Sequence, residues 1–189
     1  MKIFGIGFHK TGTKSLAKAL RLLDYSVTGP NGVADTEIAS NVFDYMDRLV
    51  PQFDAFQDNP WPLIFRQLDN RFPNSKFILT IRNSSNWIHS VVNHFGCNDT
   101  PMRQWIYGVG HPEGNEQIYL HRYQQHNEDV LSYFRTRPTD LLVMDIPSGD
   151  GWDKLCPFLN QKVPSAPFPH ANSAIARNAK TEFLAACRL

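Results

Sequence analysis

The first 25 residues combine a short apolar run, a polar loop that contains glycine, and an amphipathic segment. The run KIFGIGF, at 2–8, predicts a buried β-strand. In 13–25, leucine and alanine recur at helical spacing, so a helix is expected there. A strand, a glycine loop and a helix in this order open a βαβ unit, and this feature limits the chain to folds with a parallel sheet.

The rest of the chain alternates short apolar runs with segments of helical period. We expect further strands at 25–29, 53–58, 76–82 and 140–146, and helices at 33–50, 63–72, 83–95, 115–137, 149–160 and 173–187. Residues 96–114 are rich in glycine, proline and aromatic side chains, which predicts a long connection of the kind that serves as a lid or binding loop. No repeat or linker divides the sequence. The prediction is therefore a single α/β domain over 1–189, with a mostly parallel central sheet flanked by helices.

Charge and cysteine content argue against several classes of protein. Lysine and arginine number 19 against 18 acidic residues, which is not the balance of a nucleic-acid-binding surface. The three cysteines lack metal-ligand spacing, and no apolar run approaches the ~20 residues of a membrane span. The N-terminal apolar run is too short for a signal peptide. We expect a cytoplasmic protein with no nucleic-acid partner, no membrane span and no metal.

The loop GFHKTGTKS nearly matches the Walker A phosphate loop. Gly7 and Gly12 have the correct separation, but Thr13 occupies the lysine position and Lys14 follows one residue late. Glycine lets backbone N–H groups converge on an anion, the helix N-terminus attracts negative charge, and lysine neutralises it. The loop therefore predicts an anion site; the alternative is a polar turn with Lys14 on a solvated helix face.

Two motifs together resemble those of the sulfotransferase family. HKTGTKSL, at 9–16, is similar to its 5′-phosphosulfate loop, with His9 in place of a proline. In ILTIRNSSNWIHS, Arg82 closes a strand and Ser90 follows eight residues later, as in the family's 3′-phosphate site. At ~1.5 Å rise per residue, Ser90 lies two turns along the next helix. Residues 141–173 also resemble a branch of the family, which implies a sulfotransferase-like P-loop topology.

The resemblance implies a donor, 3′-phosphoadenosine 5′-phosphosulfate (PAPS), and no metal. It assigns PAPS binding to Lys10, Thr11, Gly12, Thr13, Lys14, Ser15, Arg82 and Ser90, the loop residues supplying N–H and hydroxyl donors. Lys10 would also be catalytic, stabilising the transferring group. Relatives place a tryptophan against adenine where this chain has Ser15, and a basic tail residue, matched weakly by Arg177, near the 3′-phosphate.

The resemblance also implies a base for the acceptor. Asp58 ends the strand before the 3′-phosphate strand and is the candidate; its alternative role is to cap the turn before Pro60. His9 is a second candidate, with shaping of the loop as its alternative role. The acceptor, a small molecule, lipid or carbohydrate with a hydroxyl or amine, is expected to contact 96–112. The tryptophans Trp61, Trp87 and Trp105 could line its pocket.

Two other functions remain open on the sequence. A P-loop kinase or NTPase would use Asp145, at the end of LLVMD, to hold Mg²⁺. A nucleotide-binding module without catalysis would keep the loop and lose the chemistry.

Overall fold

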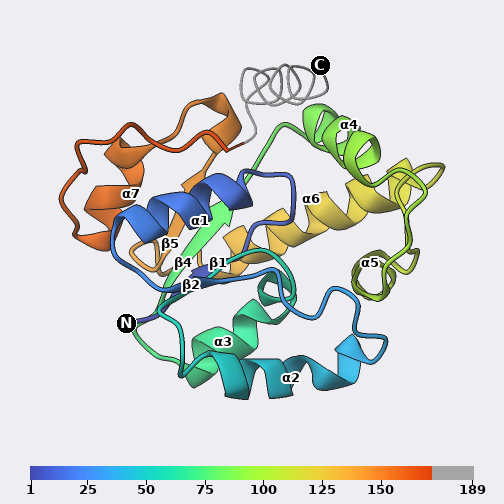
Figure 1. The fold of residues 1–189 in the computed structure, drawn as a ribbon, viewed down its shortest axis with the longest axis horizontal. Helices are drawn as coiled ribbons and strands as arrows, with labels where there is room; N and C mark the ends of the chain where they lie inside the picture. Colours follow the sequence, from blue (N-terminus) through green and yellow to red (C-terminus); the bar gives the residue numbers. More distant parts are fainter. Residues whose placement is uncertain (172–189) are drawn as a thin grey trace, which may run out of the picture.

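A five-stranded parallel sheet forms the centre of the protein (Figure 1). The structure is a computed structural model that describes residues 1–171. The strands are β1 (Ile3–Gly5), β2 (Val27–Thr28), β3 (Ala55–Phe56), β4 (Lys76–Thr80) and β5 (Leu141–Met144). Their order is β2-β3-β1-β4-β5, and each neighbouring pair is parallel. The predicted α/β class and parallel sheet are confirmed, with β1 at the centre.

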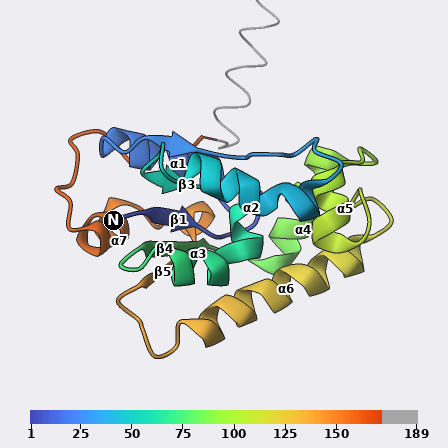
Figure 2. The same cartoon turned by 90° about the horizontal axis from the view of Figure 1, so that it is seen from below.

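Helices cover both faces of this sheet (Figures 1 and 2). They are α1 (Thr13–Leu22), α2 (Ile38–Leu49), α3 (Phe65–Arg71), α4 (Ser84–Phe95), α5 (Pro101–Tyr107), α6 (Glu116–Tyr133) and α7 (Trp152–Leu159), with 3₁₀ turns η1 (Trp61–Ile64) and η2 (Ile146–Ser148). α1 and α7 pack on one face, and α2, α3 and part of α6 pack on the other. The layers are those expected of alternating strands and helices.

Alternation along the strands builds the two cores. In β1, Ile3 belongs to the cluster under α1 and α7, whereas the next residue, Phe4, belongs to the cluster on the opposite face. Successive side chains of a strand point to opposite faces, so a strand buried on both sides reads as a continuous apolar run. A third cluster, which includes Phe8, Trp87 and Tyr119, joins α4, α5 and α6.

The segment 96–114 differs from its prediction, because it contains α5. Thr100 Oγ1 accepts a hydrogen bond from Arg103 N at 3.2 Å, and Pro101 is the first helical residue. A threonine N-cap followed by proline is a helix-start signal. The glycines on both sides obscured it in the sequence.

Two expectations fall on residues outside 1–171. The last helix, predicted at 173–187, and Arg177 lie beyond the described residues. Within the described part, no helix combines the length and apolarity needed to cross a membrane.

Candidate active site

The phosphate-type loop connects β1 to α1, and the backbone angles of two of its residues fix its shape. Lys10 has φ 67° and Gly12 has φ 104°, both in the left-handed region. A Cβ on Gly12 would lie 3.0 Å from Ile146 Cβ, so the position requires glycine for both its φ angle and its packing. Left-handed residues of this kind curl the backbone and are common where a chain binds anions.

Close packing of β1 on β4 anchors the same loop. A Cβ on Gly7 would lie 2.1 Å from Thr80 Oγ1, so only glycine fits. Thr11 is fully buried, and its hydroxyl bonds Phe8 O at 2.5 Å and Thr80 Oγ1 at 2.6 Å. The loop is thereby held against the carboxyl end of β4, from which Arg82 follows.

A cavity of about 980 Å³ opens over the loop. Eight of the nine predicted site residues line it: Lys10, Gly12, Thr13, Lys14, Ser15, Asp58, Arg82 and Ser90. The volume is at the upper end of the ~300–1,000 Å³ of typical ligand pockets. The structure therefore brings together residues that are up to 80 positions apart in the sequence.

The hydroxyl donors of the loop differ from expectation. The Thr11 side chain is absent from the cavity lining, and its hydroxyl bonds within the protein. Thr13 Oγ1 donates to Asp58 Oδ2 at 2.8 Å. Ser15 Oγ accepts from Ala171 N at 3.0 Å and retains its own proton. Of the three hydroxyls, only that of Ser15 is available to donate to a ligand.

Arg82 and Ser90 lie as the spacing predicts. Arg82 comes two residues after β4, and Ser90 is within α4, whose N-cap Asn83 accepts from Asn86 N at 3.2 Å. Arg82 Nη1 donates to Lys10 O at 3.4 Å. Within residues 1–171 no carboxylate forms an ion pair with Arg82, so its charge is not neutralised by a sheet-edge aspartate.

Asp58 lines the same cavity and is bonded to the loop through Thr13. Its side chain is buried, and its φ of 63° is unusual for a residue other than glycine. Oδ2 accepts from Thr13 Oγ1, and Oδ1 accepts from Asn59 N at 2.9 Å. Burial raises the pKa of the carboxyl; these hydrogen bonds and the charges of Lys14 and Lys10 oppose the rise to a smaller extent. Asp58 is therefore a stronger base than an exposed aspartate.

His9 is held in place through its backbone and both ring nitrogens. Asn59 Nδ2 donates to Nδ1 at 3.2 Å, and Nε2 lies 3.1 Å from Tyr107 Oη. Trp87 Nε1 donates to His9 O at 2.9 Å. Burial, followed by the charge of Arg103, lowers the pKa of His9 to about 3, so the ring is neutral. Of its two expected roles, these contacts favour shaping of the loop.

The tryptophans predicted to line an acceptor pocket do not do so. Trp61 and Trp87 are fully buried, and Trp105 packs against the core clusters. The cavity beyond Asp58 is instead lined by His9, Asn59, His94, Phe95 and Arg103, which we call the His9 wall. A second set of lining residues, which we call the loop wall, consists of Lys10, Gly12, Lys14, Arg82 and Ser90.

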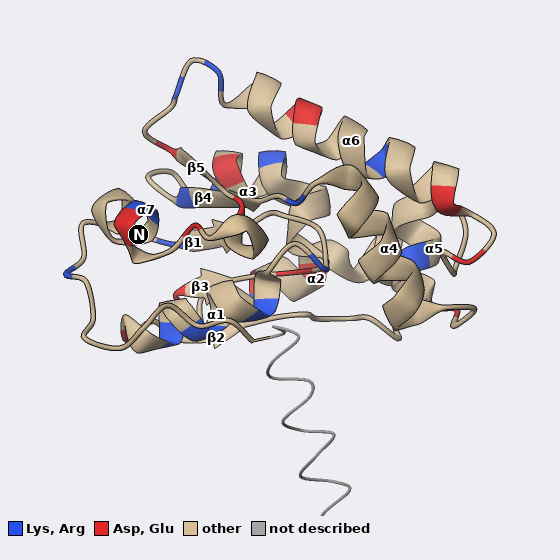
Figure 3. Ribbon diagram, turned by 90° about the horizontal axis from the view of Figure 1, so that it is seen from above, with Lys and Arg blue, Asp and Glu red and all other residues tan. Residues whose placement is uncertain are grey.

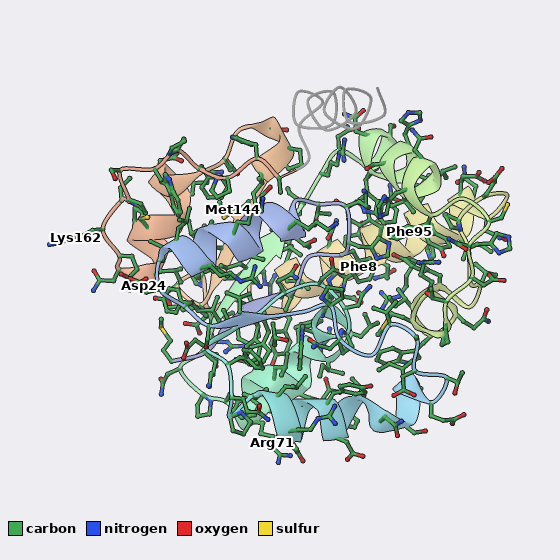
Figure 4. The ribbon with its side chains drawn as sticks, in the orientation of Figure 1. Phe8, Asp24, Arg71, Phe95, Met144 and Lys162 are labelled. Atoms are coloured by element: carbon green, nitrogen blue, oxygen red, sulfur yellow. The ribbon has the colours of Figure 1, made fainter. Side chains whose placement is uncertain are left out.

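Asn59 and Arg103 line the cavity but were not predicted from the sequence. Asn59 follows Asp58 directly, and a polar residue beside a candidate base was the only local signal for it. Arg103 lies in α5, which was itself not predicted, and it reaches the cavity only through tertiary packing. Phe8 and Phe95, labelled in Figure 4, mark the side of the molecule where this packing occurs.

The alternative magnesium site has no support from the carboxylates. Asp145 Oδ1 accepts from Ser148 N at 3.1 Å and caps η2. In residues 1–171 no three His, Cys, Asp or Glu side chains are grouped so that they could hold a metal ion.

Comparison with known proteins agrees with the motifs. The family model described as "Sulfotransferase domain" matches residues 2–112 and 99–176. A curated relative, "Ava biosynthesis cluster protein M" of Aspergillus versicolor, is 27% identical, with 66% of this chain and 56% of the relative aligned. The chain thus matches only about half the length of that relative. Since the family model covers most of the chain, this protein belongs to the sulfotransferase-domain family.

Proposed function

We propose that the protein transfers a sulfuryl group from PAPS to a hydroxyl or amine of a small molecule, lipid or carbohydrate. One observation carries this proposal: the glycine loop, the Arg82–Ser90 pair and a buried carboxylate share a single cavity. Family membership supports sulfotransferase-like chemistry. The choice of PAPS as donor rests on the loop wall.

The charge of the cavity fits an anionic nucleotide. Its lining contains six Lys and Arg side chains and one carboxylate: Lys10, Lys14, Lys18, Arg21, Arg82 and Arg103 against Asp58. The whole chain is almost balanced, with a formal net charge of +1, so the cations are concentrated here. Figure 3 shows basic residues along α1, which borders the cavity. A ligand with several phosphate or sulfate oxygens would neutralise this charge.

Each part of the loop wall has a defined task in the proposal. Lys10 and Lys14, with the N-terminus of α1, would hold the 5′-phosphosulfate. Arg82 would offer forked donors to the 3′-phosphate, and Ser90 a hydroxyl. When bound, PAPS supplies a sulfuryl group whose S–O bond to the 5′-phosphate breaks as a new S–O bond to the acceptor oxygen forms. Lys10 would neutralise negative charge that develops in this transfer.

Asp58 would take the proton from the acceptor oxygen or nitrogen. A general base must be basic enough to accept a proton from the acceptor. Burial raises the pKa of Asp58 and so makes its carboxylate more basic. Thr13 and the Asn59 N–H orient the carboxylate. His9, neutral and bonded at both nitrogens, would position this wall and take no proton.

A product assay separates this proposal from the alternatives. The protein is incubated with PAPS or with ATP and a mixture of phenols, alcohols and sugars, in Mg²⁺ or in EDTA. Formation of 3′-phosphoadenosine 5′-phosphate (PAP) in EDTA supports the proposal. Formation of ADP only with Mg²⁺ would establish a kinase or NTPase. Binding of PAP without any turnover would establish a non-catalytic module.

A further inference from the structure

The His9 wall contains a buried cation that has no carboxylate at ion-pair distance in the described part of the chain. Arg103 is 5% exposed and lines the cavity. Its Nε donates to Gly110 O at 2.9 Å and its Nη2 donates to Asn98 O, and both acceptors are neutral carbonyls. Within residues 1–171 no Asp or Glu forms an ion pair with it. A buried charge is costly unless it is paired, so a cavity-lining arginine of this kind favours an anionic ligand.

Asn59 belongs to the same wall and links it to Asp58. Asn59 is 5% exposed, and because its Nδ2 donates to His9 Nδ1, its Oδ1 is directed elsewhere. Asn59 Oδ1 is buried without a hydrogen-bond partner. Asn59 N donates to Asp58 Oδ1 at 2.9 Å, so Asn59 joins this wall to the candidate base.

Direct contacts join the two features into one surface. Asn59 bonds His9, the His9 ring meets the Phe95 ring edge to face at 5.0 Å, and the Arg103 guanidinium lies over Phe95 at 4.4 Å. His94 also lines the cavity, and the charges of Lys10, Lys14 and Arg103 add to burial in lowering its pKa. The wall thus connects Asp58, through Asn59, His9 and Phe95, to the positive charge of Arg103.

We infer that the acceptor is acidic: a hydroxyl compound whose carboxylate pairs with Arg103. This inference rests on the proposed function and specifies its substrate class. The reacting hydroxyl lies at Asp58, which receives its proton. The carboxylate takes no part in bond making; it orients the acceptor and neutralises the cation that the fold leaves buried.

Matched pairs of probes test the inference in the wild-type protein. The first pair is 4-hydroxyphenylacetate and 4-hydroxyphenethyl alcohol; the second is methyl β-glucuronide and methyl β-glucoside. Within each pair a carboxylate replaces a CH₂OH group, and the two pairs distinguish a phenolic from a carbohydrate source. Calorimetry is done with PAP at saturation, so that the loop wall is filled and cannot bind the probe.

The expected result is at least tenfold tighter binding of the carboxylate member of one pair, lost in Arg103→Met and kept in the control Arg135→Met, which changes an exposed arginine outside the cavity lining. If Arg103→Met does not fold, the ¹⁵Nε–¹H signal of Arg103 in the wild type is expected to shift with the carboxylate member and not with its alcohol. Equal binding within both pairs, no binding by any member, or a preference that survives in Arg103→Met would overturn the inference. PAP binding is recorded in the same titrations. If PAP does not bind, the proposed function itself is refuted. If PAP binds but no carboxylate is preferred, only the acidic acceptor is refuted.

Discussion

The two walls of the cavity are built in opposite ways. The loop wall takes most of its residues from two short segments, each a strand end followed by a helix start, and its shape depends on backbone angles and glycine packing. The His9 wall joins residues from the loop, the turn after β3, α4 and α5 through side-chain contacts. Local motifs determine the first wall, whereas tertiary packing determines the second. Variants of each wall should therefore affect different measurements.

Asp58→Asn, at the junction of the walls, is expected to have the largest effect. Loss of a general base typically lowers the rate by about 10²–10⁴-fold, while PAP affinity should change little. Wild-type turnover should rise with pH through the raised pKa of Asp58, and this limb should be absent in the variant. The measurement is PAP formation from PAPS against pH, with the exposed Asp44→Asn as control.

The substitution Asp58→Asn is also expected to change the stability of the fold. Because the folded-state pKa of Asp58 lies above the ordinary 3.8, ionisation weakens the fold as pH rises through that folded-state value. The unfolding temperature of Asp58→Asn at pH 7 should stay the same or rise. A large drop would assign Asp58 to structure in place of catalysis.

Gly12→Ala should damage the loop wall alone. The new Cβ would require a left-handed alanine and would press on Ile146, for a cost of about 1–3 kcal/mol in unfolding free energy. PAP binding should weaken at least about tenfold, equivalent to 1.4 kcal/mol. Gly114→Ala, also at positive φ but with no neighbour within 4 Å, is the control for backbone strain. Equal PAP affinity in both variants would refute the role of the loop.

Acid should destabilise the His9 wall. Unfolded His9 titrates near 6.5 and folded His9 near 3, so between these values the unfolded state binds more protons. Its contribution to stability is therefore full above pH 6.5 and falls with pH, by ~2 kcal/mol at pH 5. Denaturant unfolding at pH 7, 6 and 5 should show this slope reduced in His9→Gln but unchanged in the exposed His121→Gln. An unchanged slope in His9→Gln would contradict a neutral buried ring.

Tyr107→Phe should give the smallest effect. It removes the hydrogen-bond partner of His9 Nε2, at a cost of ~1 kcal/mol in unfolding free energy. Because Tyr107 belongs to the His9 side, PAP affinity should stay unchanged and binding of the carboxylate probe should weaken. Weaker PAP binding would show that the two walls are not separable.

The contrast between the walls also explains what the sequence could predict. Strand, loop and helix patterns gave the parallel sheet, and the spacing of Arg82 and Ser90 gave two residues that the fold places on one cavity. The α5 helix was missed because glycines surround its Thr100–Pro101 start. The burial of Trp61 and the position of Arg103 in the cavity lining depend on packing between segments that are distant in the sequence. Local sequence patterns therefore could not predict them.

A titration with PAP in EDTA tests the central claim most directly, comparing the wild type, Arg82→Ala and the exposed Arg135→Ala by calorimetry. The account predicts metal-independent binding by the wild type and Arg135→Ala, and at least about tenfold weaker binding by Arg82→Ala, because a charge-assisted hydrogen bond contributes ~1.5–3 kcal/mol. Equal affinity in all three proteins, or binding of ATP with Mg²⁺ in place of PAP, would contradict it.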